Sequence, residues 1–183
     1  MKGAVFLDRD GTLIFDKDYL HDPALVELIP RVVEGLQKLS EAGYLLFLLT
    51  NQSGVGRGYF RLEDAVACNQ KMMELLGDEI VFQEICIAPE APGESSLYRK
   101  PSPLFIEEML VQYNLLAQEC FMVGDRQSDI ESGLRAGVRS ILLECGKEIP
   151  DSTSVYASEK KVARSRDLFD AVEEVILKSN SIS

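Results

Sequence analysis

The sequence predicts an α/β fold: a three-layer, Rossmann-like arrangement in which a central parallel sheet carries helices on both faces. Short apolar segments rich in β-branched and aromatic residues alternate along the chain with longer segments of helical periodicity, as in repeated strand–helix–strand units. Polar or charged residues follow directly after most of the apolar segments. The 183 residues fit one domain. We therefore expect a single domain over residues 1–178, followed by a frayed tail over 179–183.

The expected strands are short and strongly apolar. Residues 44–49 are almost wholly apolar, which is typical of a central parallel strand buried on both faces. The first segment combines β-branched and aromatic residues and runs directly into acidic ones. The full set of expected strands covers residues 3–7, 44–49, 81–87, 120–123 and 138–143.

Start and stop residues mark the helices. Pro30 and Gly43 bracket the first helix, whose apolar residues share one face. Ser102 is a candidate N-cap for the third. The expected helices cover residues 31–42, 62–76, 103–113, 128–136 and 167–178.

Three connecting segments remain. Residues 14–29 and 88–102 form longer loops than usual and are candidate lids over the carboxyl edge of the sheet. Neither is long enough for a separate cap domain. Residues 150–166 are mainly polar, and we expect a surface loop there.

The amino-acid composition limits the classes of partner that this protein could bind. The net charge of −11 argues against nucleic acid, because binding to a phosphate backbone needs a basic face. No apolar run approaches the roughly 18 residues that a membrane helix needs, and the N-terminal apolar run is too short for a signal peptide. The four cysteines lie far apart, without a CxxC pair, which is typical of reduced thiols. We expect a cytoplasmic protein without a nucleic-acid or membrane partner.

The first strand runs into Asp8-Arg9-Asp10-Gly11-Thr12. Two carboxylates at positions i and i+2 of an extended segment point the same way, roughly 7 Å apart, and can flank one Mg²⁺ and one phosphorus atom. One carboxylate could attack the phosphoryl group, and the other could protonate the leaving oxygen and later activate water. Taken alone, the pair could equally be an ordinary acidic turn.

Further polar residues follow the other strands. Hydroxyl, amide and basic side chains there suit phosphate oxygens, and Asp125 after the fourth strand could complete a metal site. Each group has a simpler interpretation by itself: a polar turn, a solvated basic pair, or, for Ser128 and Asp129, a helix cap. Their joint occurrence at four strand ends favours a phosphate site formed by Asp8, Asp10, Thr50, Asn51, Gln52, Ser53, Arg99, Lys100 and Asp125.

These motifs resemble those of the haloacid-dehalogenase-like (HAD) superfamily of phosphatases over residues 3–145. Asp8-Arg9-Asp10-Gly11-Thr12 is similar to the first motif, and Gly124-Asp125 opens the fourth. Thr50-Asn51-Gln52 and Arg99-Lys100-Pro101 are similar to the second and third. The glycine-rich 52–59 stretch is similar to the capless subgroup that contains heptose bisphosphate and histidinol-phosphate phosphatases.

The resemblance implies residue roles. Asp8 would be nucleophile and metal ligand, Asp10 acid/base and ligand through its backbone carbonyl, and Asp125 the third protein ligand of Mg²⁺. Thr50, Asn51, Gln52, Ser53, Arg99 and Lys100 would hold phosphate or substrate. Asp16 to Tyr19, with His21 nearby, would form a substrate-facing flap. Arg126 replaces a lysine of the heptose enzymes, and its role is left open, as is that of His21.

One departure concerns zinc. Relatives carry Cys-x-His and Cys-x-Cys ahead of the third motif, whereas the matching positions here are Cys86, Ala88, Ser96 and Tyr98. One ligand of four cannot build a tetrahedral site, so no structural zinc is expected.

The sequence thus predicts a magnesium-dependent phosphatase that acts through an aspartyl-phosphate on a small phosphorylated metabolite. The resemblance favours removal of the 7-phosphate from D-glycero-D-manno-heptose 1,7-bisphosphate. Histidinol phosphate, another sugar phosphate, or a non-catalytic phosphate-binding module are the alternatives. A monomer is the expected state.

Overall fold

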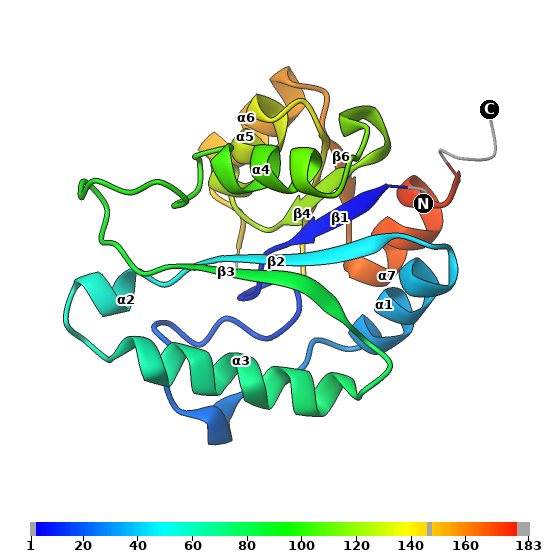
Figure 1. Cartoon of the computed structure of the whole chain (residues 1–183). Coiled ribbons are helices and arrows are strands. Elements are labelled where there is room, and N and C mark those ends of the chain that lie inside the picture. The colour runs from blue at the N-terminus through cyan, green and yellow to red at the C-terminus, as the bar shows by residue number, and fades with distance from the viewer. Residues whose placement is uncertain (1–2, 146–147, 179–183) are drawn as a thin grey trace.

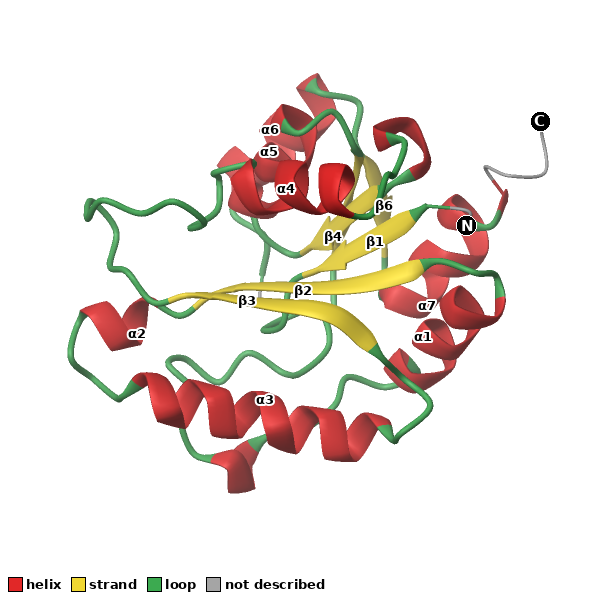
Figure 2. Cartoon of the chain, in the orientation of Figure 1, coloured by secondary structure: helices red, strands yellow, loops and turns green. Residues whose placement is uncertain are grey.

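The computed structural model describes residues 3–145 and 148–178, which build a six-stranded parallel sheet in the order β3-β2-β1-β4-β5-β6 (Figures 1 and 2). The expected α/β class is confirmed. The expected tail over 179–183 lies outside the described residues. The strands are β1 (Ala4–Leu7), β2 (Leu45–Asn51), β3 (Phe82–Ala88), β4 (Phe121–Gly124), β5 (Arg139–Leu143) and β6 (Ala163–Ser165).

Helices cover both faces of the sheet (Figure 2). On one face lie α1 (Val32–Glu41), α3 (Leu62–Leu76) and α7 (Leu168–Ala171), and on the other lie α4 (Leu104–Gln112), α5 (Gln127–Arg135) and α6 (Asp151–Glu159). The connections include the short α2 (Ser53–Gly56) and the turns η1 (Pro23–Leu25) and η2 (Ala117–Glu119). The π-helical turn η3 (Val172–Ile176) directly follows α7. None of the helices in the described ranges is long and apolar enough to cross a membrane.

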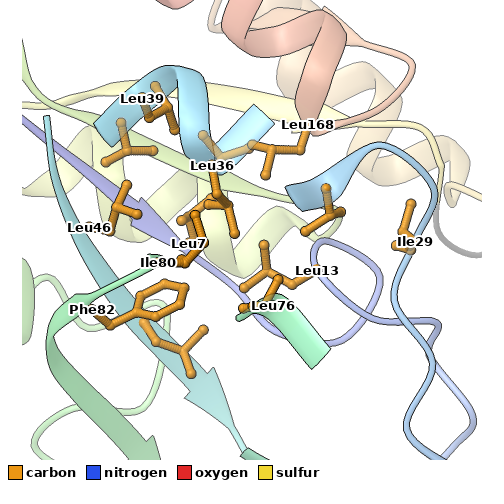
Figure 3. Close-up of a cluster of buried hydrophobic side chains, with 14 of the residues drawn as sticks. Leu7, Leu13, Ile29, Leu36, Leu39, Leu46, Leu76, Ile80, Phe82 and Leu168 are labelled. Carbon is orange, nitrogen blue, oxygen red and sulfur yellow. The ribbon is translucent and has the colours of Figure 1, made fainter. Parts of the chain in front are cut away.

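Alternation along β1 divides the core into two. Val5 and Leu7 pack into the cluster beneath α1, α3 and α7, whereas Ala4 and Phe6 pack toward α4. All four side chains are fully buried, as expected for the central strand of a parallel sheet covered on both faces. Figure 3 shows the first cluster, where leucines of α1, α3 and α7 meet β1 and β2.

One expectation about the C-terminal part is wrong. Residues 150–166 form helix α6 and strand β6 rather than a surface loop, and β6 pairs with β5. Only Thr153 and Ala157 of α6 are buried, so the helix shows too narrow an apolar stripe to be recognised within a polar segment. The expected final helix is present, and at Val172 it changes from the α-helix α7 to the π-helical turn η3.

The strand order places the functional edge. From β1 the chain builds outward through β2 to β3, then returns across β1 to add β4, β5 and β6. The order therefore reverses between β1 and β4, and ligands of open α/β sheets bind at such a point, beyond the carboxyl ends of the strands. Asp8 follows β1 there, and Asp125 follows β4.

Candidate active site

Asp8 lies at the carboxyl end of β1, where its backbone N–H donates to the Val123 carbonyl at 3.0 Å. Its Oδ1 is 2.7 Å from Nζ of Lys100. That ammonium also lies 2.7 Å from Oδ1 of Asp129 and donates to the Leu49 carbonyl at 2.8 Å. The Lys100 ammonium thus has three oxygens within 2.8 Å, two of them from carboxylates, although its side chain is only 1% exposed. Burial alone would lower the pKa of Lys100, but the two carboxylates outweigh it and raise that pKa.

Asp8, Asp125 and Asp129 form a buried carboxylate cluster whose ligand oxygens lie within 4.8 Å of one another. Desolvation, reinforced by the other two carboxylates, raises the pKa of Asp125 to about 8. Desolvation also raises the pKa of Asp8, even with Lys100 beside it. Oδ1 of Asp125 is buried without a hydrogen-bond partner among the described residues. Hard, anionic oxygens with an unfilled acceptor are a donor set that fits Mg²⁺.

Two glycines make room for this cluster. A Cβ on Gly11 would lie 2.2 Å from Oδ2 of Asp125, and a Cβ on Gly124 would lie 2.3 Å from Oδ2 of Asp129. Gly11 also has φ +77°, a backbone conformation that favours glycine. The Asp8–Thr12 turn and the end of β4 can therefore approach each other closely enough for their carboxylates to converge.

The Asp10 carboxylate is held separately from this cluster. Arg9 donates to it through Nε at 3.1 Å and Nη2 at 3.2 Å, and Nε2 of Gln52 donates at 2.9 Å. The Asp10 side chain is 18% exposed and lines the same cavity as Asp8. The expected pair of carboxylates therefore shares one cavity, but each is anchored by its own buried cation. Metal binding through the Asp10 backbone carbonyl stays a prediction.

Three residues expected to hold phosphate contact the protein itself. Asn51 exchanges two hydrogen bonds with the backbone of Lys100, each 3.0 Å, and so fixes the start of the cis Lys100–Pro101 bond. Thr50 is buried, accepts from Gln52 at 2.8 Å and is absent from the cavity lining. Asn51 and Gln52 do line the cavity, but their described hydrogen bonds orient Lys100 and Asp10. Substrate contact by these three residues remains a prediction.

The cavity has a volume of about 250 Å³ and a polar wall. Ser53, Arg99, Arg126, Asp16 and Tyr19 all line it, and phosphate or substrate binding by them stays a prediction. Nη2 of Arg126 donates to Oδ2 of Asp16 at 2.8 Å and thereby joins the end of β4 to the first long loop. Burial lowers the pKa of Arg99, with further lowering from the neighbouring Arg57 and Arg126. Arg126 has a side chain 59% exposed and lies at the mouth of the cavity, whereas Asp8, Lys100 and Asp129 are buried at its base.

The first long loop is anchored by aromatic contacts. The ring of Tyr19 packs edge-on against Tyr59 with centroids 4.9 Å apart, and His21 stacks on Phe60 at 5.4 Å. His21 therefore packs outside the cavity lining, whereas Asp18, which belongs to the expected flap, lies within it. The sequence left the individual role of Asp18 open, because nothing in the pattern distinguishes it from the neighbouring Asp16.

Hydrogen bonds close the loop that precedes Arg99. Glu94 accepts from the backbone N–H of Ala91, Ser96 accepts from that of Arg99 at 3.0 Å, and Arg99 donates to the Glu90 carbonyl at 2.9 Å. Tyr98, at one of the positions that match the zinc ligands of the relatives, donates its hydroxyl hydrogen to Glu108 at 2.9 Å. These hydrogen bonds close the loop, and none of them involves Cys86.

Comparison with known proteins places these features in context. A family model described as HAD-hydrolase-like matches residues 97–171. D-glycero-β-D-manno-heptose-1,7-bisphosphate 7-phosphatase of Helicobacter pylori is 37% identical over 142 residues, 76% of this chain and 82% of that protein. The histidine biosynthesis bifunctional protein of Legionella pneumophila is 33% identical over 75% of this chain but only 40% of its own length.

Solved structures share the fold. The crystal structure of D,D-heptose 1,7-bisphosphate phosphatase from B. bronchiseptica, complexed with magnesium and phosphate, matches with a TM-score of 0.84. The alignment covers 96% of this chain and 99% of the other at 24% identity. At that identity the likeness supports the arrangement of strands and helices described above.

Proposed function

Because this chain belongs to the HAD-like family of phosphatases, we propose that it hydrolyses a sugar phosphate, with the 7-phosphate of D-glycero-D-manno-heptose 1,7-bisphosphate as its substrate. One observation carries the proposal. Asp8 lies at the base of a polar cavity beside Lys100 and forms a carboxylate cluster with Asp125 and Asp129, and a further carboxylate, Asp10, lines the same cavity. The 37% identity to a heptose bisphosphate phosphatase supports the choice of substrate.

The two carboxylates divide the reaction between them. An oxygen of Asp8 attacks phosphorus, so that an acyl-phosphate bond forms while the bond to the sugar oxygen breaks. Asp10 gives a proton to that leaving oxygen. In the second half, Asp10 takes a proton from water, which attacks the same phosphorus and releases inorganic phosphate and free Asp8. Lys100 keeps Asp8 fixed throughout, and Asn51 keeps Lys100 fixed.

Asp8 and Asp125 would hold Mg²⁺, with the Asp10 carbonyl as a third ligand and Asp129 beside them. When bound, the cation would supply positive charge beside the phosphoryl oxygens. At the mouth, Arg99 and Arg126 offer charge for a second anionic group, which suits a bisphosphate. Tyr19 and Asp16 offer acceptors and a ring edge for the sugar hydroxyls.

We further propose that the protein is a cytoplasmic monomer without structural zinc, and that it binds neither nucleic acid nor membrane. The four cysteines are unpaired, which suits a reducing compartment. Hydrogen bonds of Glu94, Ser96 and Arg99 close the loop at the position where the relatives carry their zinc motif. The net charge of −11 opposes association with a polyanion.

Phosphate release from a panel of metabolites tests this function. The panel comprises heptose 1,7-bisphosphate, histidinol phosphate, other sugar phosphates and nucleotides, each with Mg²⁺ and with EDTA. We expect release from heptose bisphosphate with Mg²⁺, its loss in EDTA, and its loss in Asp8→Asn. Asp78→Asn, an exposed Asp→Asn change in the α3–β3 connection, should retain full activity.

The outcomes separate the candidates. A preference for histidinol phosphate would replace the substrate and keep the chemistry. Full activity in Asp8→Asn would refute the covalent route. A folded wild type that binds Mg²⁺ and releases phosphate from no member of the panel would favour a phosphate-binding module.

A further inference from the structure

Arg9 lies between the two catalytic carboxylates in sequence, yet its side chain is 0% exposed. A buried guanidinium is costly unless its donors are satisfied by paired, well-placed acceptors. The Nε and Nη2 groups of Arg9 donate to Asp10. Its Nη1 group turns to α3, where it donates to Oδ1 of Asn69 at 2.9 Å and approaches the Ala65 carbonyl at 3.4 Å.

We propose that Arg9 and Asn69 are positioning residues that aim the Asp10 carboxylate at the leaving oxygen of the substrate. Two parallel donors fix a carboxylate in rotation as well as in position, which a single charge does not do. Asn69 in turn fixes the plane of the guanidinium from α3, 60 residues away in sequence. The inference rests on the proposed function, because it assigns a role in that reaction.

The chemistry of Asn69 supports a positioning role rather than a packing role. It is 4% exposed on the inner face of α3, and its Nδ2 is buried without a hydrogen-bond partner among the described residues. An unsatisfied buried donor is destabilising, so packing of α3 gives no reason for an amide there beyond its contact with Arg9. Its oxygen has one described partner, Arg9. A neutral acceptor orients the guanidinium without competing with Asp10 for its charge.

Gln52 completes the arrangement from the opposite side. Its Nε2 bridges Oδ2 of Asp10 and the hydroxyl of Thr50. Asp10 is therefore held by Gln52, which follows the end of β2 and bonds to Thr50 in that strand, and by α3 through Arg9 and Asn69. A misdirected proton donor loses much of its effect even when its chemistry is unchanged, so loosening either anchor should impair proton transfer to the leaving group.

The leaving group provides the test. Protonation matters greatly when a sugar alkoxide departs and little when 4-nitrophenolate departs. The ratio of kcat/KM for a sugar phosphate to kcat/KM for 4-nitrophenyl phosphate therefore reports on Asp10 as acid. Because kcat/KM covers only the steps through formation of the aspartyl-phosphate, the second half-reaction does not enter. Both values come from one enzyme sample, so the fraction of folded protein cancels.

The variants are Asn69→Leu, which keeps the size and removes the acceptor, and Arg9→Lys, which keeps the charge and removes the fork. We expect kcat/KM for the sugar phosphate to fall by about tenfold or more, within the range for general acid catalysis. For 4-nitrophenyl phosphate it should fall less than about threefold. Met72→Ala is the structural control: it opens a cavity in α3 three residues beyond Asn69 and should leave the ratio unchanged.

An unchanged ratio in both Asn69→Leu and Arg9→Lys would overturn the inference, whether or not total activity falls. So would an equal change of the ratio in Met72→Ala. If wild type releases no phosphate in an Asp8-dependent manner, the proposed function fails and this inference fails with it. If the wild type is active and the ratio is unchanged in the two variants, only the positioning role is refuted.

Discussion

Replacing Lys100 by methionine tests how the buried charges are balanced. Methionine approximates the length of lysine, so the change removes the ammonium with little loss of packing. Oδ1 of Asp8, Oδ1 of Asp129 and the Leu49 carbonyl then lose donors at 2.7, 2.7 and 2.8 Å. Removing one partner of a buried ion pair costs about 3–5 kcal/mol, and we expect that loss in the free energy of unfolding.

Urea denaturation at neutral pH in EDTA measures this loss in the free energy of unfolding. Lys71→Met is the matched control, because Lys71 is 40% exposed and pairs with Glu74 on the surface of α3. That pair should contribute no more than about 0.5 kcal/mol. Mg²⁺ should stabilise Lys100→Met more than wild type, since the cation opposes the same carboxylates. A loss below about 1 kcal/mol in Lys100→Met would refute this account of the buried charges.

Three other perturbations probe neighbouring features. Gly11→Ala should abolish Mg²⁺ binding measured by calorimetry, because the new Cβ would lie 2.2 Å from Asp125. Gly58→Ala is the control: its φ of +71° is similar but the space around the new Cβ is open, so Mg²⁺ binding should be retained. Asp10→Asn should slow turnover of a sugar phosphate by roughly 10²–10⁴-fold in steady-state assays, as expected for lost general acid–base catalysis, with the fold unchanged by circular dichroism. In EDTA, stability should fall as pH rises from 5 to 8 by up to about 4 kcal/mol. The cause is that Asp125 keeps its proton in the folded state until about pH 8, whereas in the unfolded state it ionises near 3.8. Urea unfolding of Asp125→Asn should show a flatter pH dependence, and an equal slope in both proteins would contradict that explanation.

The sequence was most informative where strands end. Asp8 and Asp125 were identifiable because parallel strands bring their carboxyl ends to one edge, so polar residues after separate apolar runs must converge. The same rule does not say which polar group faces a ligand and which faces another side chain. Thr50, Asn51 and Gln52 were expected to hold phosphate. In the structure, the Asn51 side chain donates to the Lys100 carbonyl, and the Gln52 side chain donates to Asp10 and to Thr50.

Long-range partners were beyond sequence reasoning. Arg9 reads as a charged residue in a turn, and only packing of α3 against the β1 loop brings Asn69 within 2.9 Å of it. In the C-terminal part, α6 buries too few residues to show a helical stripe, and β6 has three residues. Both elements are set by contacts with β5 and α5 rather than by their own patterning.

The cluster at the base of the cavity has a defined charge imbalance. Asp8, Asp125 and Asp129 carry three negative charges when ionised, and Lys100 supplies one positive charge. Arg126 lies 4.0 Å from Asp125, but its charge is balanced by Asp16 at 2.8 Å. Without that pair the sum, −3 + 1, is −2. A divalent cation neutralises that remainder, whereas a metal-free protein reduces it by keeping a proton on Asp125, as the raised pKa of about 8 indicates. Cation binding and loss of that proton are therefore linked. Affinity for Mg²⁺ should consequently rise with pH over the same interval in which the metal-free protein loses stability.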